Sequence, residues 1–202
     1  MTDRRNKRWT RAVCGGLTLC LLLSLCGLYG ACDGVRERVV RLHVLANSDS
    51  EEDQALKLKV RDAVVETAAG WMDTAADTEE ALALAREELP RLQQAAERVV
   101  TEAGYTYPVQ VELCETYFTT RQYDTVTLPA GWYQAVRVSI GEAKGQNWWC
   151  VVYPPMCASA ATGRDVLSDV LTGGQQQLVQ ERRYVVKFKV VEWFETVLNW
   201  FR

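Results

Sequence analysis

The sequence contains one histidine, His43, so any chemistry that needs an imidazole must use that side chain. None of the seven cysteines has the Cys-x-x-Cys spacing typical of zinc and thiol redox sites. The Gly-x-Ser-x-Gly motif of many hydrolases is absent, and the glycines of residues 141–145 have the wrong spacing for a phosphate loop. We therefore expect no catalytic residue, no metal site and no cofactor.

The first 32 residues differ in character from the rest of the chain. Five basic residues lie within the first eleven positions, opposed only by Asp3, and residues 12–32 carry no charge and are rich in leucine. A basic flank before an apolar run is typical of an export signal, and about 20 helical residues cross a bilayer core. We expect residues 1–32 to be an N-terminal signal peptide or membrane anchor, which contacts the membrane through residues 12–32 if it stays uncleaved.

The sequence leaves open whether this segment is removed. The best cleavage site follows Ala31, but bulky Tyr29 stands where a small residue is usual. Cys32 also permits a lipoprotein interpretation, although the preceding residues lack the usual leucine. We favour an uncleaved or slowly cleaved anchor and expect residues 36–202 to form the exported domain.

The exported part is acidic. The first 32 residues hold five basic groups and one acid, which leaves 18 Lys and Arg against 25 Asp and Glu, a net charge of −7. Such a body is not attracted to nucleic acid or to anionic lipid. We therefore expect protein partners and no nucleic acid.

Two cysteines of the body are candidates for a disulfide. Cys150 and Cys157 flank a Pro154-Pro155 turn, so their side chains could meet in an oxidising space. Two buried free thiols are an equally acceptable alternative, because cysteine is often simply a buried small side chain.

Helical periodicity appears in two regions near the start of the body. The first covers about residues 51–70, with Ser50 as its cap, and the second about residues 77–104. Pro90 interrupts the second region and predicts a kink or two consecutive helices.

Alternating apolar residues predict strands elsewhere, at residues 39–45, 109–113, 136–140 and 184–188, and a continuous apolar run predicts one at 148–153. We expect 136–140 and 148–153 to pair as a hairpin whose second strand is central. Residues 158–180 read as a connector with a short helix near 166–171, and 190–201 as an amphipathic helix. The predicted fold class is α+β, a mixed or antiparallel sheet packed against helices.

Aromatic and cationic side chains gather around the expected hairpin and are candidates for partner binding. They are Arg121, Tyr123, Trp132, Trp148 and Trp149. Trp, Tyr and Arg often anchor protein interfaces, whereas core packing is the alternative for the large rings.

His43 lies close in sequence to Ser48 and Asp49, which invites a catalytic triad. A triad is defined by positions in space, and nothing in the sequence orders these three groups. A histidine satisfied by its neighbours in a strand is the preferred interpretation, and an exported hydrolase is the alternative function.

Several long blocks resemble the stage II sporulation protein R family. The first is RLHVLANSDS at residues 41–50, continued by EDQALKLKVRD at 52–62. Further blocks are TR at 120–121, LPAG at 128–131, NWWCV at 147–151, PPMC at 154–157 and VKFK at 186–189. The similarity runs from about residue 36 to the end of the chain.

The resemblance implies a signalling protein of endospore formation that is not an enzyme. Family members are made in the forespore and exported into the space between forespore and mother cell. There they activate a membrane-embedded aspartic protease of the mother cell, which cleaves the precursor of an early mother-cell sigma factor. The resemblance supplies no catalytic residues. We expect the same localisation here, with the protein either released or membrane-tethered.

Overall fold

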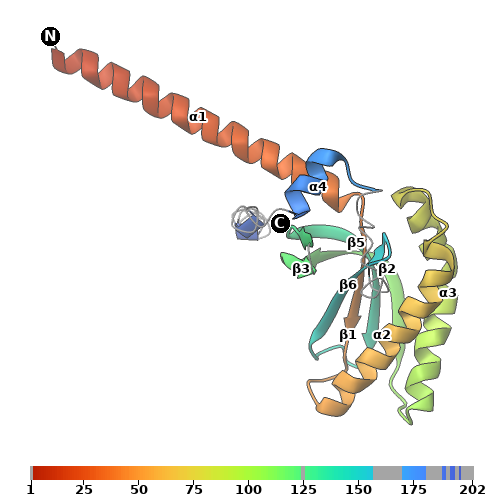
Figure 1. Cartoon of the computed structure of the whole chain (residues 1–202). Coiled ribbons are helices and arrows are strands. Elements are labelled where there is room, and N and C mark those ends of the chain that lie inside the picture. Colours follow the sequence, from red (N-terminus) through yellow and green to blue (C-terminus); the bar gives the residue numbers. More distant parts are fainter. Residues whose placement is uncertain are drawn as a thin grey trace.

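The chain folds around a mixed β-sheet with helices packed against it, which confirms the expected α+β class (Figure 1). The computed structural model describes residues 2–123, 126–156, 170–180, 188–189, 192–193 and 196, without the side chains of part of the first helix. The helices are α1 (Thr2–Arg36), α2 (Glu51–Met72), α3 (Thr78–Glu102) and α4 (Gly173–Gln180). The strands are β1 (Val40–Leu45), β2 (Val109–Phe118), β3 (Arg121–Tyr123), β4 (Val126–Leu128), β5 (Gly131–Ile140) and β6 (Asn147–Tyr153).

The main sheet has the strand order β2-β5-β1-β6, and β3 and β4 form a separate hairpin. β1 runs parallel to β5, with Leu42 opposite Val136, and antiparallel to β6, with Leu42 opposite Cys150. β2 pairs with β5 along its whole length. β1 is therefore a central strand, flanked by two strands that lie about 90 to 110 residues later in the chain.

The predicted hairpin of 136–140 with 148–153 is wrong. β5 and β6 follow each other in the chain, but β1 lies between them and β6 is an edge strand. The connecting loop instead crosses the end of β1, where Gly145 N donates to Ala46 O at 2.9 Å and Lys144 N to Asn47 O at 3.2 Å. Val40, Leu42 and Val44 of β1 are fully buried, in keeping with its place between β5 and β6.

α2 and α3 cover one face of the sheet, called here the first face (Figure 1). Apolar residues of β1, β5 and β6 pack there against both helices, for example Leu42, Val138 and Val152 against Val60 and Leu92. The helix starts follow the predicted caps: Asp53 N donates to Ser50 Oγ at 3.2 Å, and Glu80 N to the Asp77 carboxylate at 2.9 Å. Local capping chemistry therefore sets both starts.

α2 differs from the prediction, because it passes Gly70 and ends at Met72. α3 is one helix that continues through Pro90, which rules out the alternative of two consecutive helices. Pro90 is exposed, so its ring points away from the core that holds the helix in place. Gly104 follows the end of α3, as expected, and has a positive φ of 82°.

The opposite side of the sheet, the second face, is covered by segments from several parts of the chain. The end of α1, the β3–β4 hairpin and α4 pack there around a second apolar cluster that includes Val35, Phe118, Leu128, Tyr133 and Leu178. In Figure 1 these elements gather at the end of the sheet where β5 begins. α4 itself lies within the region that the sequence predicted to be a connector.

Both edges of the main sheet are partly capped by side chains. The amide of Gln93 on α3 bonds the β2 edge at Val109 O (2.6 Å) and Val111 N (2.7 Å). The Tyr123 hydroxyl donates to Trp149 O on β6 at 3.2 Å. Such caps reduce the exposed backbone that makes edge strands prone to pairing with other chains.

α1 leaves the body as one long helix (Figure 1). Several of its apolar side chains are exposed, among them Val13, Leu17 and Leu23. In the part of the chain that the structure describes, no helix has the length together with the apolar character needed to cross a bilayer. Whether residues 1–32 form an anchor therefore stays a prediction.

The C-terminal predictions fall largely outside the described residues. This applies to the short helix near 166–171, to strand residues 184–187 and to most of the amphipathic helix at 190–201. Phe188, expected at the end of a strand, is helical and buried, and Trp193 is helical and exposed.

Gly141 lies in the β5–β6 loop at a position where a larger residue is expected to destabilise the fold. Its φ is +59°, and a Cβ there would collide with the side chain of Asn47. We expect Gly141→Ala to lower the free energy of unfolding by roughly 1–3 kcal/mol, measured by urea denaturation of the detergent-solubilised chain. Gly70→Ala is the matched control, because Gly70 is helical with open space around it and should gain roughly 0.4–1 kcal/mol. Equal effects of the two substitutions would contradict this account of the loop.

Candidate partner-binding surface

The second face carries a cation, Arg41, that is completely buried in the central strand. Its Nε donates to Cys150 O at 3.0 Å and its Nη2 to the Tyr123 hydroxyl. Its guanidinium carbon lies 4.2 Å from the ring centre of Phe118 and 5.0 Å from that of Tyr133. No carboxylate forms an ion pair with Arg41 among the described residues, so ring faces and oxygen atoms stabilise the charge.

Burial dominates the protonation equilibria around this cation. Desolvation lowers the pKa of Arg41, while the nearby Tyr123 and Tyr133 oppose that shift. Desolvation also raises the pKa of both tyrosines, with Arg41 acting in the opposite direction. The phenols therefore stay neutral, and Tyr133 uses its hydroxyl to donate to Pro129 O at 2.6 Å.

The buried cluster continues to the surface as a stack of rings and cations. Trp149 packs edge-on against Phe118, with ring centres 4.8 Å apart, and lies 5.2 Å from the ring of His43. The exposed Arg121 places its guanidinium carbon 4.8 Å from the Trp149 ring centre. The structure thus brings three of the predicted residues, Arg121, Tyr123 and Trp149, into one cluster.

The other two predicted residues lie elsewhere. Trp148 is 36% exposed and points to the first face, where Arg61 of α2 lies 4.3 Å from its ring centre. Trp132 is half-buried and packs edge-on against Tyr117 at 5.7 Å. Neighbouring residues of a strand point to opposite faces, so Trp148 and Trp149 cannot belong to one surface.

His43 is held in a way that does not resemble a catalytic histidine. Its Nε2 lies 3.0 Å from Asn147 Oδ1, and its Nδ1 has no hydrogen-bond partner among the described residues. Ser48 Oγ donates to the Asp53 carboxylate, and Asp49 accepts from Gln146 N at 2.7 Å. The serine and aspartate of the suspected triad are therefore bonded to other groups.

The loop after β1 forms a network of polar contacts at the end of the molecule where α2 begins. Asn47 Nδ2 donates to the Asp53 carboxylate at 2.8 Å, and Asn47 Oδ1 accepts from Glu142 N at 3.0 Å. The hydrogen bond from Ser48 is the main cause that lowers the pKa of Asp53, and burial opposes it. This network joins the β1–α2 loop to the β5–β6 loop.

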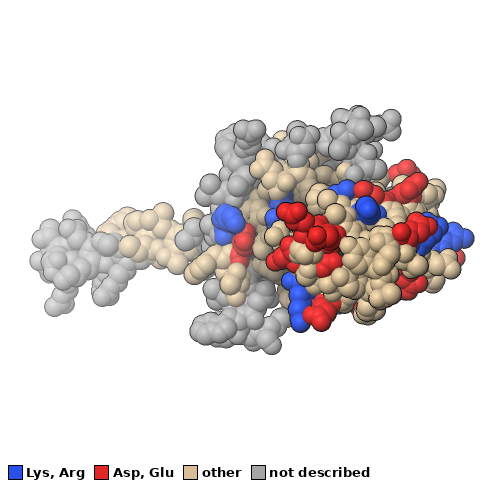
Figure 2. Space-filling model, turned by 90° about the horizontal axis from the view of Figure 1, so that it is seen from below, with Lys and Arg blue, Asp and Glu red and all other residues tan. Residues whose placement is uncertain are grey.

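Lys57 of α2 also belongs to this polar network. It is 5% exposed, and its Nζ donates to Gln146 O at 2.9 Å and to the Gln54 side chain. Desolvation lowers its pKa, which Asp49 partly offsets. Figure 2 shows this end of the molecule face-on, with Asp and Glu side chains gathered on it.

Cys150 is disulfide-bonded. Its predicted partner, Cys157, lies outside the described residues, so the pairing itself stays a prediction.

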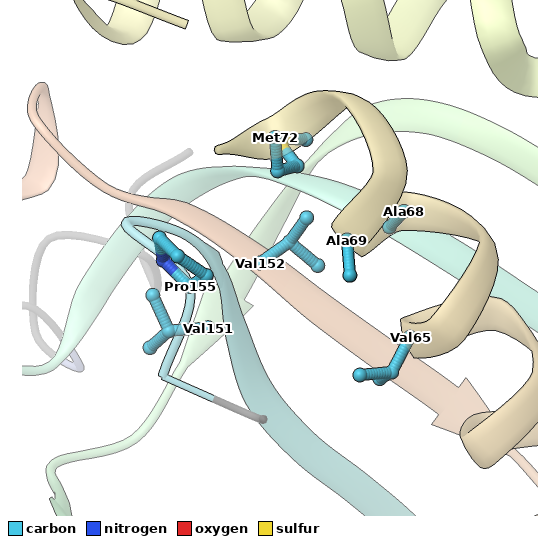
Figure 3. Close-up of a pocket in the computed structure, with 7 residues that line it drawn as sticks. All are labelled: Val65, Ala68, Ala69, Met72, Val151, Val152 and Pro155. Atoms are coloured by element: carbon cyan, nitrogen blue, oxygen red, sulfur yellow. The ribbon is translucent and has the colours of Figure 1, made fainter. Parts of the chain in front are cut away.

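The described hollows do not suit a substrate. An apolar cavity between α2 and β6 measures about 20 Å³, room for about one water, and is lined by the seven residues labelled in Figure 3. A hollow of about 270 Å³ beside α2 and α3 is an open depression lined partly by Arg91 and Arg98. Across the described residues, no group of three or more His, Cys, Asp or Glu could hold a metal ion.

Sequence reasoning missed the residues that organise this surface, above all Arg41, Phe118 and Tyr133. The available signal for this cluster was an arginine inside an apolar strand, together with the many aromatic residues later in the chain. It could not show that the rings surround the guanidinium.

Arg41→Ala tests whether the buried cation organises the second face. The substitution leaves a cavity and removes a hydrogen bond from each of Cys150 O and Tyr123, so we expect a loss of roughly 3–5 kcal/mol in unfolding free energy. Arg121→Ala, at the exposed end of the same stack, should cost less than about 1 kcal/mol. Urea denaturation followed by tryptophan fluorescence distinguishes the two, and similar losses would contradict the central role of Arg41.

His43 predicts a pH dependence of stability. Burial lowers its pKa below the usual value, Asn147 opposes the shift, and Arg137 and Arg41 reinforce it. The unfolded chain then binds the proton more readily, so the native state loses stability as pH falls through about 6.5. We expect wild type to lose more stability than His43→Gln between pH 8 and pH 5 in thermal denaturation. Parallel curves for the two proteins would show that His43 does not contribute.

Comparison with known proteins agrees with the resemblance of the sequence blocks. Residues 36–163 match the sequence model of the family described as stage II sporulation protein R. Stage II sporulation protein R of Bacillus subtilis (strain 168) is 30% identical over 187 residues, which covers 82% of this chain and 84% of that protein. No solved structure matches the chain. The chain therefore belongs to the stage II sporulation protein R family.

Proposed function

We propose that this protein is an exported, non-enzymatic signal that activates a membrane-embedded aspartic protease of the mother cell during endospore formation. The protease then cleaves the precursor of an early mother-cell sigma factor. Membership of the stage II sporulation protein R family supports a role in sporulation, and it is the observation that carries this proposal. The finer steps are inferred from the family resemblance and from the physical character of the surface.

The ring-and-cation cluster of the second face supports a binding role. Arg121 is exposed, yet it rests on Trp149, which is itself fixed by Phe118 and by the Tyr123 hydrogen bond to its carbonyl. A side chain held in place before binding loses less entropy when a partner arrives. A ligand activates its target only if it binds the active state more tightly, so a rigid surface of this kind suits an activator.

The charge and the polar groups of the body support the same function. The acidic domain and the carboxylates gathered in Figure 2 disfavour binding to nucleic acid. Ser48 and Asp49 are engaged with Asp53 and Gln146 rather than with His43, so the geometry does not favour the hydrolase alternative. We place the protein in the space between forespore and mother cell, tethered or released.

Reconstitution in a non-sporulating bacterium tests the proposal. The cognate protease and the sigma-factor precursor are produced with or without this protein, and precursor cleavage is followed by immunoblot. We expect cleavage only when the exported protein is present. Absence of cleavage despite confirmed export and folding would overturn the proposed activation.

The same assay locates the binding surface. Arg121→Ala should reduce cleavage by about tenfold, because loss of one interface anchor commonly costs more than 1 kcal/mol. Arg91→Ala is the matched control, since Arg91 is an exposed arginine on α3 that pairs only with Glu88 among the described residues. Trp148→Ala tests the first face independently. Full activity of the Arg121 variant would exclude the second-face surface.

A further inference from the structure

The last two turns of α1 belong to the folded domain. Cys32 and Val35 are completely buried in the apolar cluster of the second face, and Leu28, Tyr29 and Ala31 pack against it. The helix shows no break between the export segment and these residues (Figure 1). The domain therefore begins inside the segment that sequence reasoning assigned to the signal or anchor.

Arg36 fixes the end of this helix to the sheet. Its guanidinium donates to Ala130 O, lies 3.6 Å from the Asp33 carboxylate and stands 5.2 Å from the Tyr29 ring centre. Gly131, with a φ of +146°, lies directly against it, and a Cβ at that position would collide with the guanidinium. The start of β5 is thus shaped around Arg36.

α4 encloses the same turns on another side. α1 contacts both α4 and β5, and Leu178 and Val179 of α4 are buried in the shared cluster. Gly34 approaches α4 so closely that a Cβ there would collide with the side chain of Gln175. The end of α1 is therefore held between the sheet and α4.

The candidate cleavage site lies within these enclosed turns. Hydrolysis of the Ala31–Cys32 amide would consume one water and leave a carboxylate on Ala31 and an amine on Cys32. A peptidase needs access to a locally unfolded chain, whereas this bond is helical and Cys32 is fully buried. Tyr29, the residue that weakens the site, packs into the cluster and against Arg36, so its size has a structural reason.

We propose that folding of the domain shields the Ala31–Cys32 bond from the export peptidase, so that the folded protein keeps its N-terminal helix. This inference rests on the export proposed above. Cleavage then competes with folding: a chain cut before α4 packs is released, and a chain that folds first stays attached. The domain itself therefore decides between a tethered and a released signal.

A set of full-length variants tests the shielding by pulse labelling in a bacterium with a signal peptidase. Tyr29→Ala creates a small-x-small site. In the folded chain we expect this variant to be processed only slowly. Combining it with Val179→Asp, which disturbs α4 and leaves the export sequence unchanged, should speed processing by about tenfold. Tyr29→Ala with Gly131→Leu acts from the β5 side and should have the same effect.

A fusion of residues 1–40 carrying Tyr29→Ala to an unrelated exported reporter is the control, and it should be cut rapidly because no domain covers the site. Equal processing of the Tyr29→Ala chain with and without the domain-disturbing substitutions would overturn the shielding. A reporter that is exported but left uncut would also overturn the shielding, because the segment would then resist cleavage without the domain. A reporter that is not exported would instead refute the export segment, and with it both the proposed function and this inference.

Discussion

The guanidinium of Arg41 lies in the central strand without contact to water, and other groups must replace its hydration shell. A buried charge is costly unless hydrogen bonds and favourable electrostatics compensate. Here the compensation comes from Cys150 O on β6, the Tyr123 hydroxyl on β3, and the rings of Phe118 on β2 and Tyr133 on β5. One side chain of β1 therefore ties together the sheet and the small hairpin, which would be marginally stable alone.

The sequence predicts the elements of the fold better than their arrangement. Helix starts depend on neighbours three residues away, so Ser50 and Asp77 identify them correctly. Alternation likewise locates β1, β2 and β5, because it follows from one strand having two faces, and a continuous apolar run locates β6. Neither pattern carries information about which strands are neighbours. β5 and β6 are adjacent in sequence and look like a hairpin, whereas the burial of β1 on both sides places that strand between them.

The candidate surface is predictable to a similar extent. Of the residues that composition singles out, the structure brings Arg121, Tyr123 and Trp149 together and places Trp148 on the other face, because adjacent strand residues face opposite ways. Arg41 and His43 alternate with apolar residues and therefore resemble the solvent side of a half-exposed strand. Both are buried, because α1, the β3–β4 hairpin and α4 cover that side. Such cover comes from distant segments, which no local pattern reports.

The two faces of the sheet are built in different ways, and the difference matters for function. α2 and α3 cover the first face, and because these helices follow each other directly, the contacts between them form between segments close in sequence. The second face needs α1, the β3–β4 hairpin and α4, and closing such long loops costs more entropy. The second face thus holds both the end of α1 and the residues that support Arg121. Phe118 and Tyr133 belong to the same cluster as Cys32 and Val35 of α1 and also surround Arg41. The packing of α1 and the rigidity of the proposed binding surface therefore depend on one set of contacts.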